Sequence, residues 1–213
     1  YADLSERMMN VISRYCDNQY VYSIDESFLH FKSYDGVIKD WHKYGHEIRS
    51  AIWKETKLPV GVGFGITSTL AKAANHAAKK LSGYNGVAVI DNDQQRRTIL
   101  ERMDVSDIWG VGRKISQRLK QQEIKTAYQF STQCPKAIRQ QFSVVAERTV
   151  NELNGISCLS WDDIKEPKKE IFSTRSFGQR IIDIHTLHSA LAAHGSIVAR
   201  KVRRQSSLIK KLM

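Results

Sequence analysis

The chain reads Val21-Tyr22-Ser23-Ile24-Asp25-Glu26-Ser27-Phe28-Leu29-His30-Phe31 near its beginning, where two adjacent carboxylates interrupt an apolar stretch. Aromatic and β-branched residues on both sides of Asp25 and Glu26 favour strands there. Because side chains alternate between the two faces of a strand, the carboxylates converge only if the backbone bends, at a bulge or a hairpin end. Convergent carboxylates favour a divalent cation between them, and their hard oxygen atoms suit Mg²⁺. The alternative is a solvated hairpin tip.

Helical periodicity is present on both sides of this stretch. Apolar residues spaced by three and four predict one amphipathic helix over 4–15 and another over 41–52. The second carries His42 and His46 four residues apart, a spacing that could seat a metal. Because Lys43 stands where a zinc protease has its glutamate, surface or half-buried histidines are the preferred interpretation.

A glycine-laced strand over 59–66 leads into an alanine-rich helix over 70–80. The glycines follow a G-x-G-x-G spacing, and no acidic residue lies about twenty positions on, which argues against a dinucleotide-binding fold. Small residues on both elements instead predict close packing of the helix against the strand. Lys72, Lys79 and Lys80 could face an anion, or could merely complement the helix dipole.

A second pattern begins near Val105. A short helix, the run Trp109-Gly110-Val111-Gly112-Arg113-Lys114 and a basic helix together predict a helix-hairpin-helix arrangement. Its glycines permit a tight turn and leave backbone N–H groups bare at a positive helix N-terminus, where a phosphate oxygen can dock. Such contacts hold a nucleic-acid backbone without reading its bases. The alternative is a helical connection without a ligand. One further helix is predicted over 135–153.

The last part of the chain has a different composition. Residues 161–169 are charged and contain a proline, which predicts a linker. Residues 171–181 then have strand character with interspersed basic residues, and a helix is predicted over 186–202. Because one strand and one helix cannot bury their apolar faces alone, we expect the chain to be truncated here. We also expect the true start to lie upstream, because the chain begins with Tyr1 in an element already under way.

Composition narrows the class of protein. The chain has 213 residues, 41% of them hydrophobic, without an apolar run of membrane-spanning length or a signal-peptide pattern. Its three cysteines indicate neither a disulfide framework nor a zinc site, so a reducing, cytoplasmic setting is expected. The net charge of +11 divides into +1 for residues 1–104, +3 for 105–165 and +7 for 166–213. This gradient predicts acidic chemistry in the first part and a grip on nucleic acid in the last.

Several stretches together resemble the Y-family translesion DNA polymerases, and within them the bacterial SOS polymerase V type. The matching stretches follow the family's order: 22–28, 61–63, 70–72, 75–80, 109–113 and 175–178. The resemblance implies an α+β fold in three parts. Residues 1–104 would be a partial palm with a mixed sheet and helices, 105–165 an all-α helix-hairpin-helix thumb, and 166–213 a linker with the start of a truncated α/β little finger.

The resemblance also implies an activity, the addition of nucleotides opposite damaged template bases during the SOS response, near the bacterial nucleoid. Asp25 and Glu26 would be catalytic residues holding two Mg²⁺ ions, and Lys79 would contact the incoming dNTP. The residues expected to hold primer-template DNA are Gly110, Val111, Gly112, Arg113, Lys114, Arg175, Ser176 and Arg180. The implied protein partners are a cleaved accessory-subunit dimer, a recombinase filament and a sliding clamp, with no membrane.

The chain departs from the family pattern at several points. Ser27 stands where Ala is more usual, and Ser68 where polymerase V relatives tend to have Lys, so one positive charge near the nucleotide is missing. Family members also carry a third metal-binding Asp ahead of the part that this chain matches. We therefore expect the chain alone to be inactive. The competing interpretations are a non-catalytic DNA-binding module and a helix-hairpin-helix adaptor.

Overall fold

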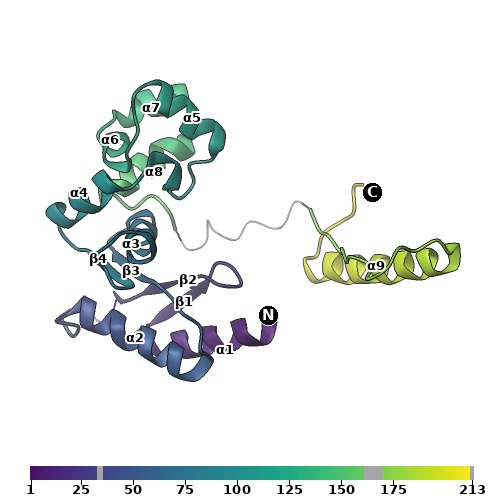
Figure 1. Ribbon diagram of the computed structural model, residues 1–213. Helices are drawn as coiled ribbons and strands as arrows, with labels where there is room; N and C mark the ends of the chain where they lie inside the picture. Colours follow the sequence, from purple (N-terminus) through teal and green to yellow (C-terminus); the bar gives the residue numbers. More distant parts are fainter. Residues whose placement is uncertain (33–35, 161–169, 212–213) are drawn as a thin grey trace. The chain divides into compact units, whose positions relative to one another are not determined.

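The computed structural model describes residues 1–32, 36–160 and 170–211. It divides the chain into two compact units, Tyr1–Trp161 and Asp162–Met213 (Figure 1). The linker predicted over 161–169 lies outside the described residues. Among those that are described, no helix is both long enough and apolar enough to cross a membrane.

The first unit contains two small sheets. Strands β1 (Asn18–Val21) and β2 (Ser27–His30) form an antiparallel hairpin, whereas β3 (Val62–Gly65) and β4 (Val87–Ile90) pair in parallel. The single mixed sheet expected here is therefore wrong. Both strand directions occur, but no ladder in the described ranges joins the hairpin to the parallel pair.

Four α-helices belong to this part of the unit: α1 (Ala2–Ile12), α2 (Trp41–Thr56), α3 (Ser68–Lys80) and α4 (Asp93–Arg102). The helices predicted over 4–15, 41–52 and 70–80 are confirmed, although a 3₁₀ turn, η1 (Ser13–Tyr15), ends the first one. Helix α4 was not predicted, because it is strongly polar and buries only Ile99 and Leu100. Its start is marked by the Asn92 side chain, which accepts a hydrogen bond from the Gln95 N–H.

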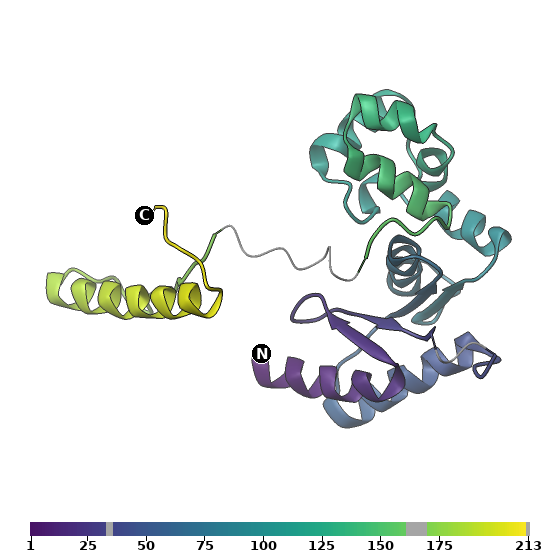
Figure 2. The same ribbon diagram turned by 180° about the vertical axis from the view of Figure 1, so that it is seen from behind.

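Glycines decide how α3 lies on the parallel strands. A Cβ atom added to Gly63 would lie 2.1 Å from the backbone nitrogen of Asn75, and one added to Gly65 would lie 2.6 Å from that of Ala71. The predicted close approach of helix to strand is thus confirmed. Helix α2 contacts the same two strands, and Figures 1 and 2 place α2 and α3 on opposite sides of them.

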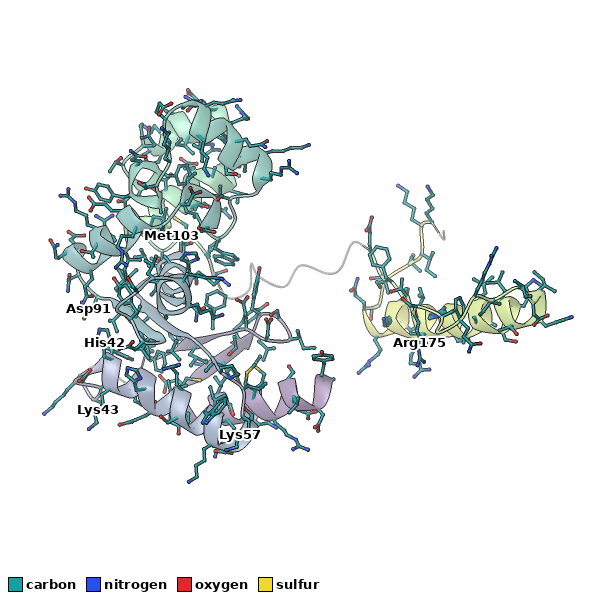
Figure 3. The ribbon with its side chains drawn as sticks, in the orientation of Figure 1. His42, Lys43, Lys57, Asp91, Met103 and Arg175 are labelled. Carbon is teal, nitrogen blue, oxygen red and sulfur yellow. The ribbon has the colours of Figure 1, made fainter. Side chains whose placement is uncertain are left out.

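Two clusters of buried side chains stabilise the unit. One joins α1 to α2 through Met8, Ile12, Ile48 and Ile52. The other is larger and continuous from α3 and β4 through α4 into the helices that follow, with Met103 (Figure 3) near its middle in sequence. The β1–β2 hairpin packs on the first cluster through Leu29, whereas the later helices share the second. The β3–β4 pair lies between them, with Phe64 packed on the first cluster and Ile90 in the second.

The helices that follow are short. They are the 3₁₀ turn η3 (Val105–Asp107), α5 (Arg113–Gln121), α6 (Ala127–Ser131), α7 (Pro135–Gln141) and α8 (Val144–Leu153). The prediction of a single helix over 135–153 is wrong, since the helix is interrupted between α7 and α8. Phe142 leaves helical geometry, and Ser143 is extended with its side chain accepting from the Ala146 N–H. An N-cap serine starts a new helix more readily than it continues an old one.

A buried carboxylate joins α8 to the start of α3. The Glu152 side chain accepts hydrogen bonds from the backbone N–H groups of Thr69 at 3.0 Å, Cys158 at 2.7 Å and Leu159 at 3.3 Å. The Thr67 hydroxyl donates to the Glu152 carbonyl at 2.8 Å. Glu152 is 1% exposed, so these bonds replace water around a charged group and fix the later helices against α3.

The second unit contains helix α9 (Ile184–Arg204), which begins two residues before the predicted start because Asp183 caps it. The strand predicted over 171–181 is wrong, since this segment is irregular. No partner strand is available in the described part of the unit, and the segment bonds to α9 instead. The Lys201 Nζ donates to the Phe172 carbonyl at 2.7 Å, and the Ser173 hydroxyl lies 2.7 Å from the His194 Nδ1.

Candidate cation and nucleic-acid site

The two carboxylates of the opening stretch lie in the turn of the β1–β2 hairpin. The Glu26 carbonyl accepts from the N–H groups of Tyr22 and Ser23, both at 3.0 Å, and the Ser23 hydroxyl donates to the Asp25 carboxylate at 2.5 Å. The predicted bend at a hairpin end is confirmed. None of these turn residues has a positive φ, which explains why no glycine announces the bend. We call residues 22–26 the acidic turn.

Both carboxylates line one cavity of about 450 Å³. Its walls include strand β3 and the α3 side chains Lys72 and Lys79, so acidic and basic groups from separate elements face one space. Asp25 is exposed and Glu26 is half-buried, hence the pair is not simply a solvated tip. The third lysine considered on this helix, Lys80, is exposed and does not line the cavity.

Lys72 is the cation nearest to the acidic turn. Its Nζ lies 2.8 Å from Glu26 Oε1 and 5.6 Å from the centre of the Tyr22 ring. Lys79 reaches the cavity by another route, because its aliphatic chain crosses Gly61 closely enough that a Cβ there would lie 2.8 Å from it. Two lysines seven residues apart on α3 thus supply positive charge to the same space.

The donor set suits Mg²⁺ in chemistry, since Asp25 and Glu26 offer hard carboxylate oxygens at a water-accessible cavity. The ammonium of Lys72 stands against Glu26 where a cation would bind. The described residues hold no group of three or more His, Cys, Asp or Glu side chains able to bind a metal. Within the described residues the acidic turn therefore offers such an ion two carboxylates, and Mg²⁺ commonly keeps several water ligands besides its carboxylates. His42 (Figure 3) lines a separate small cavity with Tyr84.

Gly110, Val111, Gly112, Arg113 and Lys114, predicted to bind phosphate, lie together where a turn leads into α5. We call residues 106–114 the thumb hairpin, after the thumb expected for this part of the chain. Gly110 has φ +87°, a left-handed conformation that favours glycine. Gly112 is the N-cap of α5 and offers no side-chain cap, so the first N–H groups of α5 lack intrahelical partners. Arg113 and Lys114 are exposed beside them, whereas the Val111 side chain is buried and can contribute only its backbone.

Trp109 connects the thumb hairpin to the acidic turn. Its Nε1 donates to the Tyr22 hydroxyl at 3.3 Å, and its ring centre lies 5.7 Å from that of Tyr22 and 5.5 Å from that of Phe28. A second contact joins His76 on α3 to Asp107, at 3.9 Å. The contact between Trp109 and Tyr22 was not predicted from the sequence, although each of the two motifs contains one of these aromatic residues.

The remaining predicted DNA contacts, Arg175, Ser176 and Arg180, belong to the second unit. All three are exposed and lie in the irregular segment before α9, with Arg175 labelled in Figure 3. The two arginine side chains are therefore exposed to solvent on a segment that forms no strand.

Comparison with known proteins finds a family model and several relatives that this chain resembles. The model of the impB/mucB/samB family matches residues 1–76. Protein UmuC of Salmonella typhimurium strain LT2 is 41% identical over 204 residues, and protein SamB of Salmonella typhimurium is 40% identical over 205 residues. Each match covers 95% of this chain and 48% of the relative. The chain is thus similar to the impB/mucB/samB family over residues 1–76, and to these two proteins over 95% of its own length. It spans about half the length of these relatives.

Solved polymerase structures share the fold of this chain. A Y-family DNA polymerase chimera superposes with a TM-score of 0.67 at 20% identity, covering 95% of this chain and 57% of the other. The insertion ternary complex of Dbh DNA polymerase gives 0.59 at 19% identity, with the same coverage. The fold shared with these structures confirms the α+β class.

One carboxylate at the base of the thumb hairpin predicts a pH effect. Burial alone would raise the pKa of Asp104, but hydrogen bonds from Lys120 and Ser106 outweigh it and lower the pKa from 3.8 to about 2. The Asp104 carboxylate therefore stabilises the folded state above pH 3.8, and this stabilisation is lost as the pH falls toward 2. Because the pair is partly exposed, we expect Lys120→Met to lower the free energy of unfolding at pH 7 by under about 1 kcal/mol.

Urea unfolding of Lys120→Met and of the unmodified chain, at pH 7 and at pH 3, measures this effect. The difference between the two proteins should shrink at pH 3, where Asp104 begins to be protonated as unfolding proceeds. The matched control is Lys54→Met, which removes the charge of an exposed side chain on α2. It should leave the free energy of unfolding nearly unchanged at both pH values. A deficit for Lys120→Met that is constant with pH would contradict the assignment.

Proposed function

We propose that this chain carries the catalytic turn and the DNA-holding thumb of a translesion DNA polymerase. The observation that carries the proposal is the shared cavity, which gathers Asp25, Glu26, Lys72 and Lys79 from a hairpin and a helix. Carboxylates opposite lysines are the donor set that a metal-bound triphosphate requires. The family match and the fold shared with Y-family polymerases support the same proposal.

In this proposal the residues position reactants rather than react with them. When bound, two Mg²⁺ ions would activate the primer hydroxyl and neutralise the leaving group. Asp25 and Glu26 hold that charge at the acidic turn. Lys79 binds the triphosphate, and Lys72 balances Glu26 and keeps its carboxylate oriented toward the cavity. The N–H groups at the start of α5 hold a duplex phosphate without base specificity.

The proposal extends to the parts of the protein and their partners. We assign residues 1–104 to a palm, 105–165 to a thumb and 166–213 to a linker and the start of a little finger. A third carboxylate would come from residues outside this chain, which spans about half of its UmuC and SamB relatives. Primer-template DNA and dNTP are the direct partners, during SOS repair. An accessory-subunit dimer, a recombinase filament and a sliding clamp follow from resemblance alone.

DNA binding by the thumb hairpin gives a direct test. Replacing both Arg113 and Lys114 with Gln should weaken binding of a primer-template duplex by roughly tenfold at low salt. It should also reduce the slope of log affinity against log salt by up to about 2. Fluorescence anisotropy with a labelled duplex at several salt concentrations measures both quantities. Because phosphate contacts carry no sequence information, duplexes of different sequence should respond alike.

The matched control for this experiment is Lys54→Gln, which removes an exposed charge from α2. That variant should bind duplex as the unmodified chain does. Equal losses for Lys54→Gln and for the Arg113/Lys114 pair would indicate a general charge effect and contradict the thumb-hairpin assignment. An affinity that does not vary with salt would contradict DNA binding altogether.

Primer extension distinguishes the polymerase proposal from a non-catalytic DNA-binding module. We expect no incorporation by this chain alone, because two carboxylates do not complete a two-metal site. Clear incorporation by the chain alone would refute that expectation. In the whole protein, incorporation that depends on Asp25 supports a polymerase, whereas DNA binding without any incorporation supports the binding module.

A further inference from the structure

The acidic turn is held from three directions. From α1, the Ser5 hydroxyl donates to the Ile24 carbonyl. From α3, Lys72 binds Glu26. From the thumb hairpin, Trp109 packs against Tyr22, at one end of the turn, and against Phe28 in the strand that leaves it. Two of these supports, Ser5 and Trp109, thus hold the turn without touching its carboxylates.

Trp109 differs from the other two supports in what it contacts. The Ser5 contact involves one exposed carbonyl, and the Lys72 contact is made to the carboxylate itself, where a cation would compete with it. The Trp109 indole instead touches aromatic rings on both sides of the turn, with a hydrogen bond to the Tyr22 hydroxyl that fixes its orientation. Tyr22 also contacts Phe28, at 5.7 Å between ring centres, so the three rings form one cluster.

We infer that Trp109 is a positioning residue for cation binding: the thumb hairpin, through the rings of Tyr22 and Phe28, sets the placement of Asp25 and Glu26. The inference rests on the proposed function, because it requires that the acidic turn binds a divalent cation. Residues that orient metal ligands without touching the metal commonly change metal affinity by 10- to 100-fold. Two segments of the chain then build the cation site jointly. Their contact residues, Trp109 and Tyr22, are 87 residues apart in the sequence.

The test is Mn²⁺ affinity, measured on the chain by electron paramagnetic resonance of free Mn²⁺. Trp109→Leu should bind Mn²⁺ about tenfold more weakly. Trp109→Phe keeps a ring but loses the indole N–H, so it should bind Mn²⁺ more tightly than Trp109→Leu and more weakly than the unmodified chain. Trp53→Leu, at a half-exposed tryptophan on α2, should bind as the unmodified chain does. Near-ultraviolet circular dichroism and urea unfolding establish that each variant is folded at the temperature of the titration.

The outcomes separate the inference from the proposed function. If the unmodified chain binds no Mn²⁺ at the acidic turn, the proposed cation site fails and the inference fails with it. If the unmodified chain binds and folded Trp109→Leu binds equally well, only the inference is overturned, and Trp109 is a packing residue. If Trp109→Leu does not fold, Trp109→Phe decides, because loss of the indole N–H bond alone should still weaken binding measurably. Unchanged affinity in that variant then overturns the inference.

Discussion

Replacing Asp25 with Asn should reduce nucleotide incorporation by the whole protein that contains this chain by on the order of 10⁴-fold. The substitution keeps the size of the side chain and its hydrogen bond with Ser23, but it removes one of the two negative charges that face the cavity. Groups that act as one catalytic unit lose most of their effect when any member is lost. Single-turnover primer extension with saturating DNA measures the loss.

Glu26→Gln should have a similar effect, and the double variant should be little worse than either single one. Asp93→Asn is the matched control, because Asp93 is an almost fully exposed acid on α4 outside the cavity. Its activity should remain within about twofold of the unmodified protein. Additive losses at Asp25 and Glu26, or a loss of less than tenfold at either, would contradict a shared cation site.

The second large effect is expected for Gly63→Ala, which should lower the free energy of unfolding through a steric clash alone. Gly63→Ala places a methyl group 2.1 Å from the backbone nitrogen of Asn75, so α3 must move away from β3. Overpacking of this kind costs about 3 kcal/mol of the free energy of unfolding. Because α3 carries Lys72 and Lys79, the displacement should also move positive charge away from the acidic turn.

Gly61→Ala is the matched control on the same segment. The three atoms nearest to its added methyl group all belong to the flexible side chain of Lys79, which can shift at little cost. Urea unfolding of the two variants should therefore show a large loss for Gly63→Ala and a loss under about 1 kcal/mol for Gly61→Ala. Equal losses would mean that helix and strand adjust more easily than the structure indicates.

Local chemistry predicted most elements of the first unit. The glycine-for-packing interpretation of residues 61–65 and the hairpin bend at Asp25 both follow from side-chain size and alternation. The element missed, α4, has few apolar residues and depends on its cap and on burying Leu100. The break between α7 and α8 was missed because apolar periodicity continues across it, while Ser143 favours a new start.

The predictions about sheets that proved wrong concern strand pairing, which depends on long-range contacts. Whether two strands pair depends on partners distant in the sequence, so neither the separation of the two small sheets nor the irregular segment 171–181 follows from composition. The same limit applies to the site. Asp25, Glu26 and Lys79 could be predicted from motif and resemblance, and the structure places all three at one cavity. The contact of Trp109 with Tyr22 could not, because nothing in either motif indicates its spatial partner.

The most direct test of the central claim is where Mn²⁺ binds on the isolated chain. With ¹⁵N-labelled protein and Mn²⁺ below stoichiometric amounts, paramagnetic broadening should appear first at the amides of Ile24, Asp25, Glu26 and Ser27. It should be saturable, and it should disappear in Asp25→Asn and Glu26→Gln but persist in Asp93→Asn. Broadening spread evenly over the exposed carboxylates, or unchanged in Asp25→Asn, would contradict the claim that the acidic turn is a cation site.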